Sequence, residues 1–479
     1  MKKNAFLFEI TAFVLLLIIT VSQLYGILRY KNTGSGGGTD NFYSTDVPID
    51  VVIFGSSHAA CTVNNGILWS ENGIASYTLS AGAQLGDGTE YFVKEVIANN
   101  KPKVALIETY LLLSEEFTLD SFYRSALTSK FSPRFIDYTL NVVRNNKLDR
   151  TTLEDMLLRL PIVHSRYKEL TREDFISTEE YIRGYRGSIE TVAYEPLQIS
   201  EGTTELSEST LIHVDKIIEA CQSNGVEPVF FAAPYCASEE QQNQQNALQA
   251  HVESKGCRFL NYIKDYQEYG IDFSKDLRDT DHLNDYGAEK ITRAISDVLV
   301  TEYSLPDRRG ESGYELWDDH VRYLSDRQFR YSIRECNEVS EYLNLLKDRY
   351  SDFAVLISLS GNYRAAGDDA FWPVLADFGI SQEDYEKGGT FILRSGNVSW
   401  YSDGSAEFKH YEELGTTDLN IYKAENDEFA NIILGEEIFS PAYNGISVLV
   451  FDEKLDYIVD TMQVNVYNGT EVIYAEIDD

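Results

Sequence analysis

The chain has 479 residues, of which 43% are hydrophobic, enough for two or three domains with ordinary buried cores. Its 77 acidic residues outnumber the 41 basic ones and give a formal net charge of −36. Nucleic-acid-binding proteins need a basic footprint, so this balance excludes that class and suits a well-solvated protein outside the cytoplasm.

Residues 1–31 combine a basic start with a hydrophobic run. Lys2 and Lys3 precede Ile10–Leu28, whose nineteen residues are just long enough to span a bilayer. The positive start favours a cytoplasmic N-terminus with the bulk of the chain outside. Because no small-x-small cleavage site closes the run, we predict a single-pass anchor in the cell membrane, with a cleaved signal peptide as the alternative. Residues 32–45, which include the run NTGSGGGTD, are predicted to be a flexible linker.

Short apolar runs alternate with a helical pattern between residues 46 and 110. The predicted elements are strands at Asp50–Phe54, Ala75–Leu79 and Val104–Ile107 and a helix at Glu90–Asn99. This alternation predicts an α/β fold, with a doubly wound parallel sheet between two helical layers.

The first strand ends in Gly55-Ser56-Ser57-His58. In open α/β sheets, ligands bind outside the carboxyl ends of the strands, so a serine in this turn would face a substrate. Since Gly-Ser-Ser is a common sequence, an ordinary turn is the alternative reading.

Residues 111–203 are expected to be an insertion, with helices near 133–146 and 151–159. It continues with HSRYKEL at 164–170, where His164 and Arg166 are weak candidates for binding an anionic or carbonyl group of a substrate. A capping histidine and a solvated arginine are the preferred reading. Long insertions between strands often form lids and substrate walls.

The α/β pattern resumes at residue 204. The predicted elements are helices at Thr210–Gln222, Glu239–Ser254 and Asp285–Thr301 and strands at Pro228–Ala233 and Phe259–Tyr262. The closing helix follows Asp279-Thr280-Asp281-His282. An aspartate three residues before a histidine can approach the same imidazole in a turn and fix its tautomer, leaving the other nitrogen to accept a serine proton. We prefer Asp279 to Asp281 for this role.

A serine after the first strand with Asp-x-x-His before the last helix resembles the SGNH (GDSL-like) hydrolases, over about residues 46–303. The phrases FGSSHA, HSRYKEL and DTDHLNDYGAEK resemble the DltD-like branch, membrane-anchored bacterial proteins linked to acyl transfer onto cell-surface polymers. The resemblance implies a flavodoxin-like fold and a catalytic triad of Ser57, His282 and Asp279. Ser56 stands where the family motif has aspartate.

The resemblance also implies an oxyanion hole made by the backbone N–H groups of Ser57 and Gly82. The family's Gly-x-Asn-Asp block is absent, and Gln84 and Tyr110 are weak substitutes for its donor. His58 directly follows the nucleophile, and adjacent side chains on a turn diverge, so it is a poor base for Ser57. Its role as a pocket residue or a first-turn helix residue stays open.

Residues 304–313 are predicted to be a linker and 314–479 an α+β module without a nucleophile–base pair. Its expected elements are helices at Val339–Tyr350 and Asp368–Phe378 and strands at Phe353–Leu359, Thr390–Leu393, Asn431–Leu434, Ile446–Phe451 and Ile458–Met462. Segments 353–380 and 443–461 resemble, in permuted order, the interleukin-like EMT inducer (ILEI) domain. That likeness implies a binding or assembly role.

The five cysteines, at positions 61, 221, 236, 257 and 336, show neither a Cys-x-x-Cys pair nor metal-ligand spacing with histidine. We expect buried free thiols, with one disulfide as the alternative, and neither a metal nor a cofactor.

The resulting expectation is an esterase or O-acyltransferase acting on acyl, foremost acetyl, groups of a cell-surface glycan or polymer. The resemblance implies a membrane-bound O-acyltransferase as partner. A non-catalytic surface protein that binds glycan or protein with the same fold is the alternative.

Overall fold

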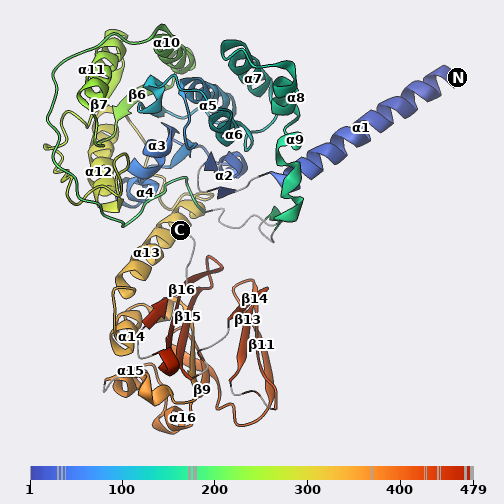
Figure 1. Ribbon diagram of the computed structural model, residues 1–479, viewed down its shortest axis with the longest axis vertical. Helices are drawn as coiled ribbons and strands as arrows, with labels where there is room; N and C mark the ends of the chain where they lie inside the picture. Colours follow the sequence, from blue (N-terminus) through green and yellow to red (C-terminus); the bar gives the residue numbers. More distant parts are fainter. Residues whose placement is uncertain are drawn as a thin grey trace. The chain divides into compact units, whose positions relative to one another are not determined.

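The computed structural model describes residues 2–29, 32–33, 36–37, 39–170, 174–175, 181–367, 370–425, 427, 429–439, 442, 444–468 and 472–474. The chain forms two compact units, Met1–Val321 and Arg322–Asp479 (Figure 1). All five cysteines are free thiols, four of them buried.

The first unit is built on five parallel strands, β3 (Val51–Gly55), β4 (Ser76–Ser80), β5 (Val104–Glu108), β6 (Glu227–Ala232) and β7 (Arg258–Asn261). Their order is β4-β3-β5-β6-β7, and every neighbouring pair is parallel. The second strand of the sheet, β4, lies on one side of β3, and the later strands β5, β6 and β7 follow in turn on the other side. This is the arrangement of flavodoxin-like doubly wound sheets. The predicted α/β parallel sheet is confirmed.

Helices cover both faces of this sheet. The side chains of β3 point alternately into the two hydrophobic cores on either side of it. Val51 and Ile53 share a core with α3 (Ser57–Thr62), α4 (Asn65–Asn72) and α12 (Asp285–Glu302). Val52 and Phe54 share the opposite core with α5 (Gly86–Asn99), α10 (Glu208–Gln222) and α11 (Glu239–Ser254) (Figure 1). Because both faces are covered, the strands are almost continuously apolar.

The N-terminal helix α1 (Lys2–Leu28) contains a stretch, Glu9–Leu28, of mean hydropathy 2.2. Among the described residues it is the one helix long and apolar enough to cross a membrane, a property that anchors and signal sequences share. Two short strands follow, β1 (Asn32–Thr33) and β2 (Gly36–Gly37), and then α2 (Thr39–Ser44).

Helix α2 contradicts part of the flexible linker predicted for 32–45. Phe42 is buried in the first unit's core, edge-on to Tyr77 with ring centroids 5.6 Å apart. The Thr39 hydroxyl donates to the carbonyl of Thr128 at 2.8 Å. The glycine-rich composition misled the prediction, because one aromatic side chain and one hydrogen bond are enough to fold this segment onto the domain.

The insertion is helical over its first half. Its elements are η1 (Leu111–Leu113), α6 (Leu119–Ala126), α7 (Pro133–Asn145), α8 (Arg150–Leu158), α9 (Leu160–Val163) and η2 (His164–Lys168). The predicted helices α7 and α8 are confirmed and begin at side-chain caps, Ser132 and Asp149. Helices α6 and α9 were not predicted.

The first unit extends past the predicted linker at 304–313. The Arg308 guanidinium binds the Asp50 carboxylate at 3.0 and 3.2 Å. Helix α13 (Glu315–Ile333) was not predicted, and its residue Trp317 is fully buried, donating from Nε1 to the Ser76 carbonyl at 2.9 Å. The division between the units therefore falls within α13, at residue 321 rather than near 313.

The second unit is α+β, with antiparallel sheets. Its helical segments are α14 (Val339–Lys347), η4 (Tyr350–Asp352), η5 (Tyr363–Ala365), α15 (Phe371–Asp377), α16 (Gln382–Lys387) and η6 (Val466–Asn468). A six-stranded sheet has the order β10 (Asn397–Ser402), β9 (Gly389–Arg394), β8 (Ala354–Ser360), β15 (Gly445–Asp452), β16 (Tyr457–Asn465), β17 (Val472–Tyr474). A four-stranded sheet consists of β11 (Phe408–Leu414), β12 (Thr417–Lys423), β13 (Asn431–Leu434) and β14 (Glu437–Phe439). Residues 368 and 369 of the helix predicted at 368–378 lie outside the described residues.

Candidate active site

The turn after β3 presents Ser57 at the carboxyl edge of the sheet. Gly55 has φ +150°, and a Cβ there would lie 2.7 Å from the Glu108 Cβ and 3.1 Å from the Ala59 Cβ. Ser56 caps α3, with its hydroxyl accepting from the His58 backbone N–H at 3.3 Å. Ser57 is the first residue of that helix, so its own N–H has no acceptor within the helix.

Ser57, His282 and Asp279 form one hydrogen-bonded chain. The Ser57 Oγ lies 2.8 Å from His282 Nε2, and His282 Nδ1 lies 2.9 and 3.0 Å from the two Asp279 carboxylate oxygens. The Asp279 carboxylate accepts the imidazole N–H at Nδ1, which leaves Nε2 free to accept the Ser57 hydroxyl proton. The structure thus brings together the three residues predicted as a triad.

Local turn geometry holds Asp279 and His282 in place. Asp279 Oδ1 accepts the backbone N–H groups of Asp281 and His282, each at 2.8 Å. Burial tends to raise the pKa of Asp279, but these N–H groups and the imidazole outweigh it and lower that pKa. Asp281 therefore contributes its backbone to this turn. Asn284 then caps α12 by accepting from the N–H groups of Tyr286 and Gly287.

His58 is packed into an aromatic cluster beside His282. Its ring stacks on Tyr110 with centroids 3.8 Å apart and lies 5.3 Å from the Tyr235 ring and 5.0 Å from the His282 ring. Burial, together with the nearby His282 and Arg278, lowers the pKa of His58 well below its usual value. His58 is thus a neutral imidazole, and its Nε2 has no hydrogen-bond partner among the described residues.

Glu108, at the end of β5, belongs to this site although the sequence reading missed it. Its Oε2 accepts from the Ser56 hydroxyl at 3.1 Å and from the Ser56 backbone N–H at 3.4 Å, and its Oε1 accepts from the Tyr110 N–H. Burial raises the pKa of Glu108 to about 7, against the lowering effect of these donors. A carboxylate ending the otherwise apolar run VALIE was the signal available in the sequence.

Gly82 and Gln84 follow β4, the parallel neighbour of β3, at the same edge of the sheet as Ser57. The Gln84 side chain is buried, and its Nε2 donates to the Thr89 hydroxyl at 3.1 Å. Its Oε1 has no hydrogen-bond partner within the described part of the chain. The turn thus agrees in position with the expected oxyanion hole, whose donors stay a prediction.

His164 and Arg166 are occupied elsewhere. Arg166 Nη1 donates to the carbonyls of Leu28 and Arg29 at 2.9 and 2.7 Å, and its Nη2 pairs with Asp174 at 2.9 Å. His164 Nδ1 lies 2.6 Å from the Pro161 carbonyl. The structure does not place them in the triad cluster, because the end of α1 supplies acceptors that Arg166 satisfies.

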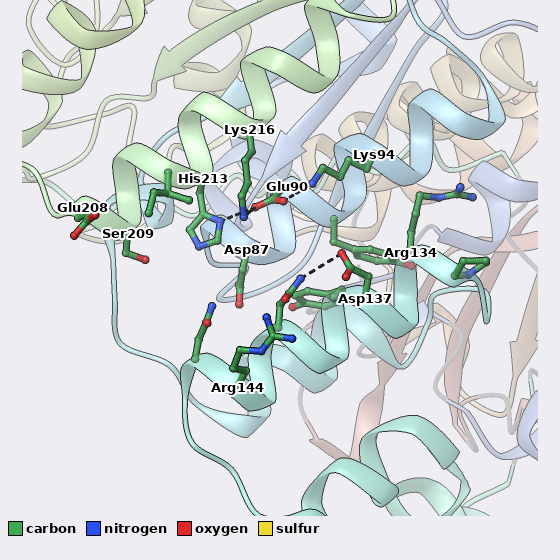
Figure 2. Close-up of a pocket in the computed structure, with 16 residues that line it drawn as sticks. Asp87, Glu90, Lys94, Arg134, Asp137, Arg144, Glu208, Ser209, His213 and Lys216 are labelled. Carbon is green, nitrogen blue, oxygen red and sulfur yellow. Dashed lines mark hydrogen bonds and ion pairs between the residues drawn. The ribbon is translucent and has the colours of Figure 1, made fainter.

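A separate cleft of about 650 Å³ lies between α5, α7 and α10. Figure 2 shows His213 and Lys216 of α10 facing Glu90 of α5, with Arg134, Asp137 and Arg144 of α7 opposite. Burial tends to raise the pKa of Glu90, but hydrogen bonds from His213 and Lys94 bring it to about 2. None of the predicted site residues lines this cleft. Within the described residues, no cluster of three His, Cys, Asp or Glu is placed to hold a metal ion.

No family model and no curated protein matches the chain. The solved structures that are similar to the chain include a candidate acylhydrolase from Bacteroides fragilis and a GDSL-like lipase from Bacteroides thetaiotaomicron. Their TM-scores are 0.29 and 0.28 at 10% and 12% identity, covering 55% of this chain and 95% and 96% of theirs. Likeness at this level is too low to assign a function, so the function proposed below rests on the geometry of the triad.

Proposed function

We propose that the chain is a serine-dependent acyl ester hydrolase or O-acyltransferase of the SGNH type. The hydrogen-bonded chain from Ser57 through His282 to Asp279 is the observation that supports it, since it joins a nucleophile, a base and an orienting carboxylate. The alternative orienting residue, Asp281, lacks this support, because its hydrogen bond to this group is a backbone N–H that donates to the Asp279 carboxylate, while His282 Nδ1 is bound by Asp279.

The chemistry follows from these three groups. The Ser57 Oγ attacks the ester carbonyl carbon while His282 Nε2 takes its proton, and Asp279 stabilises the imidazolium. The tetrahedral intermediate collapses as the leaving alkoxide takes that proton from His282, leaving an acyl-Ser57. Water, or a hydroxyl of an acceptor, then attacks the acyl group while His282 takes its proton. The bond between the acyl carbon and Ser57 Oγ breaks, and His282 returns the proton to Ser57 Oγ. The backbone N–H groups of Ser57 and Gly82 are the proposed oxyanion donors.

The proposed substrate is an acyl, foremost acetyl, ester on a cell-surface glycan or polymer, with a membrane-bound O-acyltransferase as partner. An apolar N-terminal helix favours a membrane location for the chain.

A fluorophosphonate probe tests the proposal. The full-length protein should be phosphonylated on Ser57, and Ser57→Ala should remain unlabelled. Peptide mapping separates Ser57 from Ser56, whose hydroxyl is already bound to Glu108. An unlabelled wild-type protein would favour the non-catalytic binding protein instead. A label on Ser56, or one that persists in Ser57→Ala, would overturn the assignment of Ser57 as the nucleophile.

A further inference from the structure

The last turn of α1 is held by the insertion. The Tyr25 hydroxyl donates to the Leu127 carbonyl, and Arg29 Nη1 donates to the Thr128 carbonyl at 3.4 Å. Leu28 is buried in a small core that includes Leu127 and Val163. In Figure 1, helix α9 lies beside the end of α1. The C-terminal end of the candidate membrane span therefore packs against residues of the insertion.

Large apolar side chains are exposed around this contact. Their exposed fractions are 60% for Phe131, 61% for Leu158, 63% for Tyr167 and 63% for Phe175. A soluble surface carries such residues singly, whereas a cluster of them marks an interaction site. We call these four side chains the exit face.

Each residue of the exit face is adjacent to a group that holds α1. The Arg159 guanidinium lies 4.6 Å from the Tyr25 ring centre and 5.5 Å from that of Phe131. Leu158 directly precedes Arg159 in the chain. Tyr167 follows Arg166, which binds the carbonyls at the end of α1.

Phe175 completes the set from a different segment. It follows Asp174, whose carboxylate pairs with Arg166 at 2.9 Å. Four exposed apolar side chains thus come from the stretches of the insertion whose neighbouring residues contact the end of the candidate span or pair with a residue that does.

The helical part of the insertion, residues 119–170, differs in charge from the chain as a whole. Residues 119–170 contain nine lysines and arginines and six acidic residues, whereas the whole chain has 41 and 77. A locally basic segment beside a membrane helix is attracted to anionic headgroups, from which the remaining chain is repelled.

We propose that the exit face rests in the headgroup layer of the bilayer that α1 spans, with the basic residues of the insertion near anionic lipid. This inference depends on the membrane location proposed above. Aromatic and aliphatic side chains are favoured at this depth, where rings sit at the headgroup level and apolar groups leave water. The insertion then fixes the catalytic domain at the membrane surface instead of leaving it on a loose tether.

Depth-dependent tryptophan quenching tests the inference on the full-length protein. Single variants Phe131→Trp, Tyr167→Trp and Phe175→Trp are placed in vesicles of phosphatidylcholine and phosphatidylglycerol containing chain-brominated lipid. Their emission beyond that of the wild-type protein should be quenched, most strongly by bromines near the headgroups. Val300→Trp is the matched control, since Val300 is 52% exposed on α12 of the same unit. It should not be quenched.

A fourth variant distinguishes failure of the proposed membrane location from failure of the proposed contact between the exit face and the headgroups. Phe13 lies in the candidate span and is 66% exposed, so Phe13→Trp should be quenched most by bromines near the bilayer centre. If Phe13→Trp is unquenched, the membrane location itself fails. If Phe13→Trp is quenched while the three exit-face variants are not, α1 spans the bilayer and the exit face contacts water or a protein, which overturns the inference. If the tryptophan emission of the three exit-face variants is quenched equally in vesicles with and without phosphatidylglycerol, the basic residues of the insertion do not help to bind the membrane through anionic lipid.

Discussion

Ser57, His282 and Asp279 are joined by hydrogen bonds, so their contributions to turnover should not add. We expect His282→Ala, alone or combined with Ser57→Ala, to lower kcat on an activated acetyl ester to a common floor about 10⁴–10⁶-fold below wild type. Asp279→Asn should cost less, since that carboxylate orients the base. Asp281→Asn should be mild. Near-normal turnover in His282→Ala, or a larger loss in Asp281→Asn than in Asp279→Asn, would contradict the assignment.

Glu108 binds Ser56, the neighbour of the proposed nucleophile Ser57, so we expect it to act as a positioning residue. The two carboxylate oxygens of Glu108 accept hydrogen bonds from Ser56 and from the Tyr110 N–H. In Glu108→Gln one of these oxygens becomes an NH₂ group, which cannot accept a hydrogen bond, so the turn carrying Ser57 should shift. We expect kcat to fall by about 10²-fold with little change in KM, because displacement of a reacting group affects the chemical step. Glu115→Gln, an exposed position in the following loop, is the control. Equal kcat values in the two variants would show that Glu108 has no positioning role.

The raised pKa of Glu108 also makes the stability of the first unit depend on pH. The pKa rises from 4.5 to about 7 on folding, so the folded chain keeps a proton that the unfolded chain releases between these values. The resulting stability is full below pH 4.5 and is lost as pH rises through 7, a difference of about 3 kcal/mol. Urea unfolding in detergent should show this decline for the wild-type protein, and Glu108→Gln should have a flatter profile.

Among the helices, α2 shows how a short element can join the domain core. Phe42→Ala should lower the free energy of unfolding by about 3–5 kcal/mol, because it leaves a cavity against Tyr77. Phe131→Ala is a matched control, since Phe131 is 60% exposed, and it should change stability by less than about 0.5 kcal/mol. Similar urea midpoints for the two variants would instead support the prediction that residues 32–45 are a flexible linker.

For the whole molecule, the end of the first unit decides which fragments keep the chemistry. A chain ending at residue 333 retains Trp317 and should hydrolyse a small activated ester like the full-length protein. A chain ending at 310 lacks that buried side chain, whose loss alone costs about 3–5 kcal/mol. Its urea midpoint should therefore be clearly lower. Equal midpoints would place the boundary near 313, as the sequence suggested, and an inactive but folded 1–333 chain would assign part of the chemistry to the second unit.

Elements with strong periodicity could be predicted from the sequence. The strand at Val51–Gly55 and the helix at Glu239–Ser254 follow from an uninterrupted apolar run and from a capped helical pattern, which are local properties. Helix α13 escaped because its buried residues, such as Trp317, are spaced among charged ones. The Asp279–His282 contact was also predictable, because three residues of turn determine it.

By itself, the sequence determined the features set within a few residues: the apolar strands of the parallel sheet, the apolar N-terminal helix, and the pairing of Asp279 with His282. Only the tertiary structure decided what joins residues far apart in the chain. It placed Glu108 at Ser56, and Arg166 at the end of α1 instead of at the triad. The contact between His282 and Ser57, which are 225 positions apart, was expected from the family resemblance alone and not from any local pattern. The physical reason is that side-chain hydrogen bonds depend on distance in space, and the sheet order and the packing of the insertion set that distance.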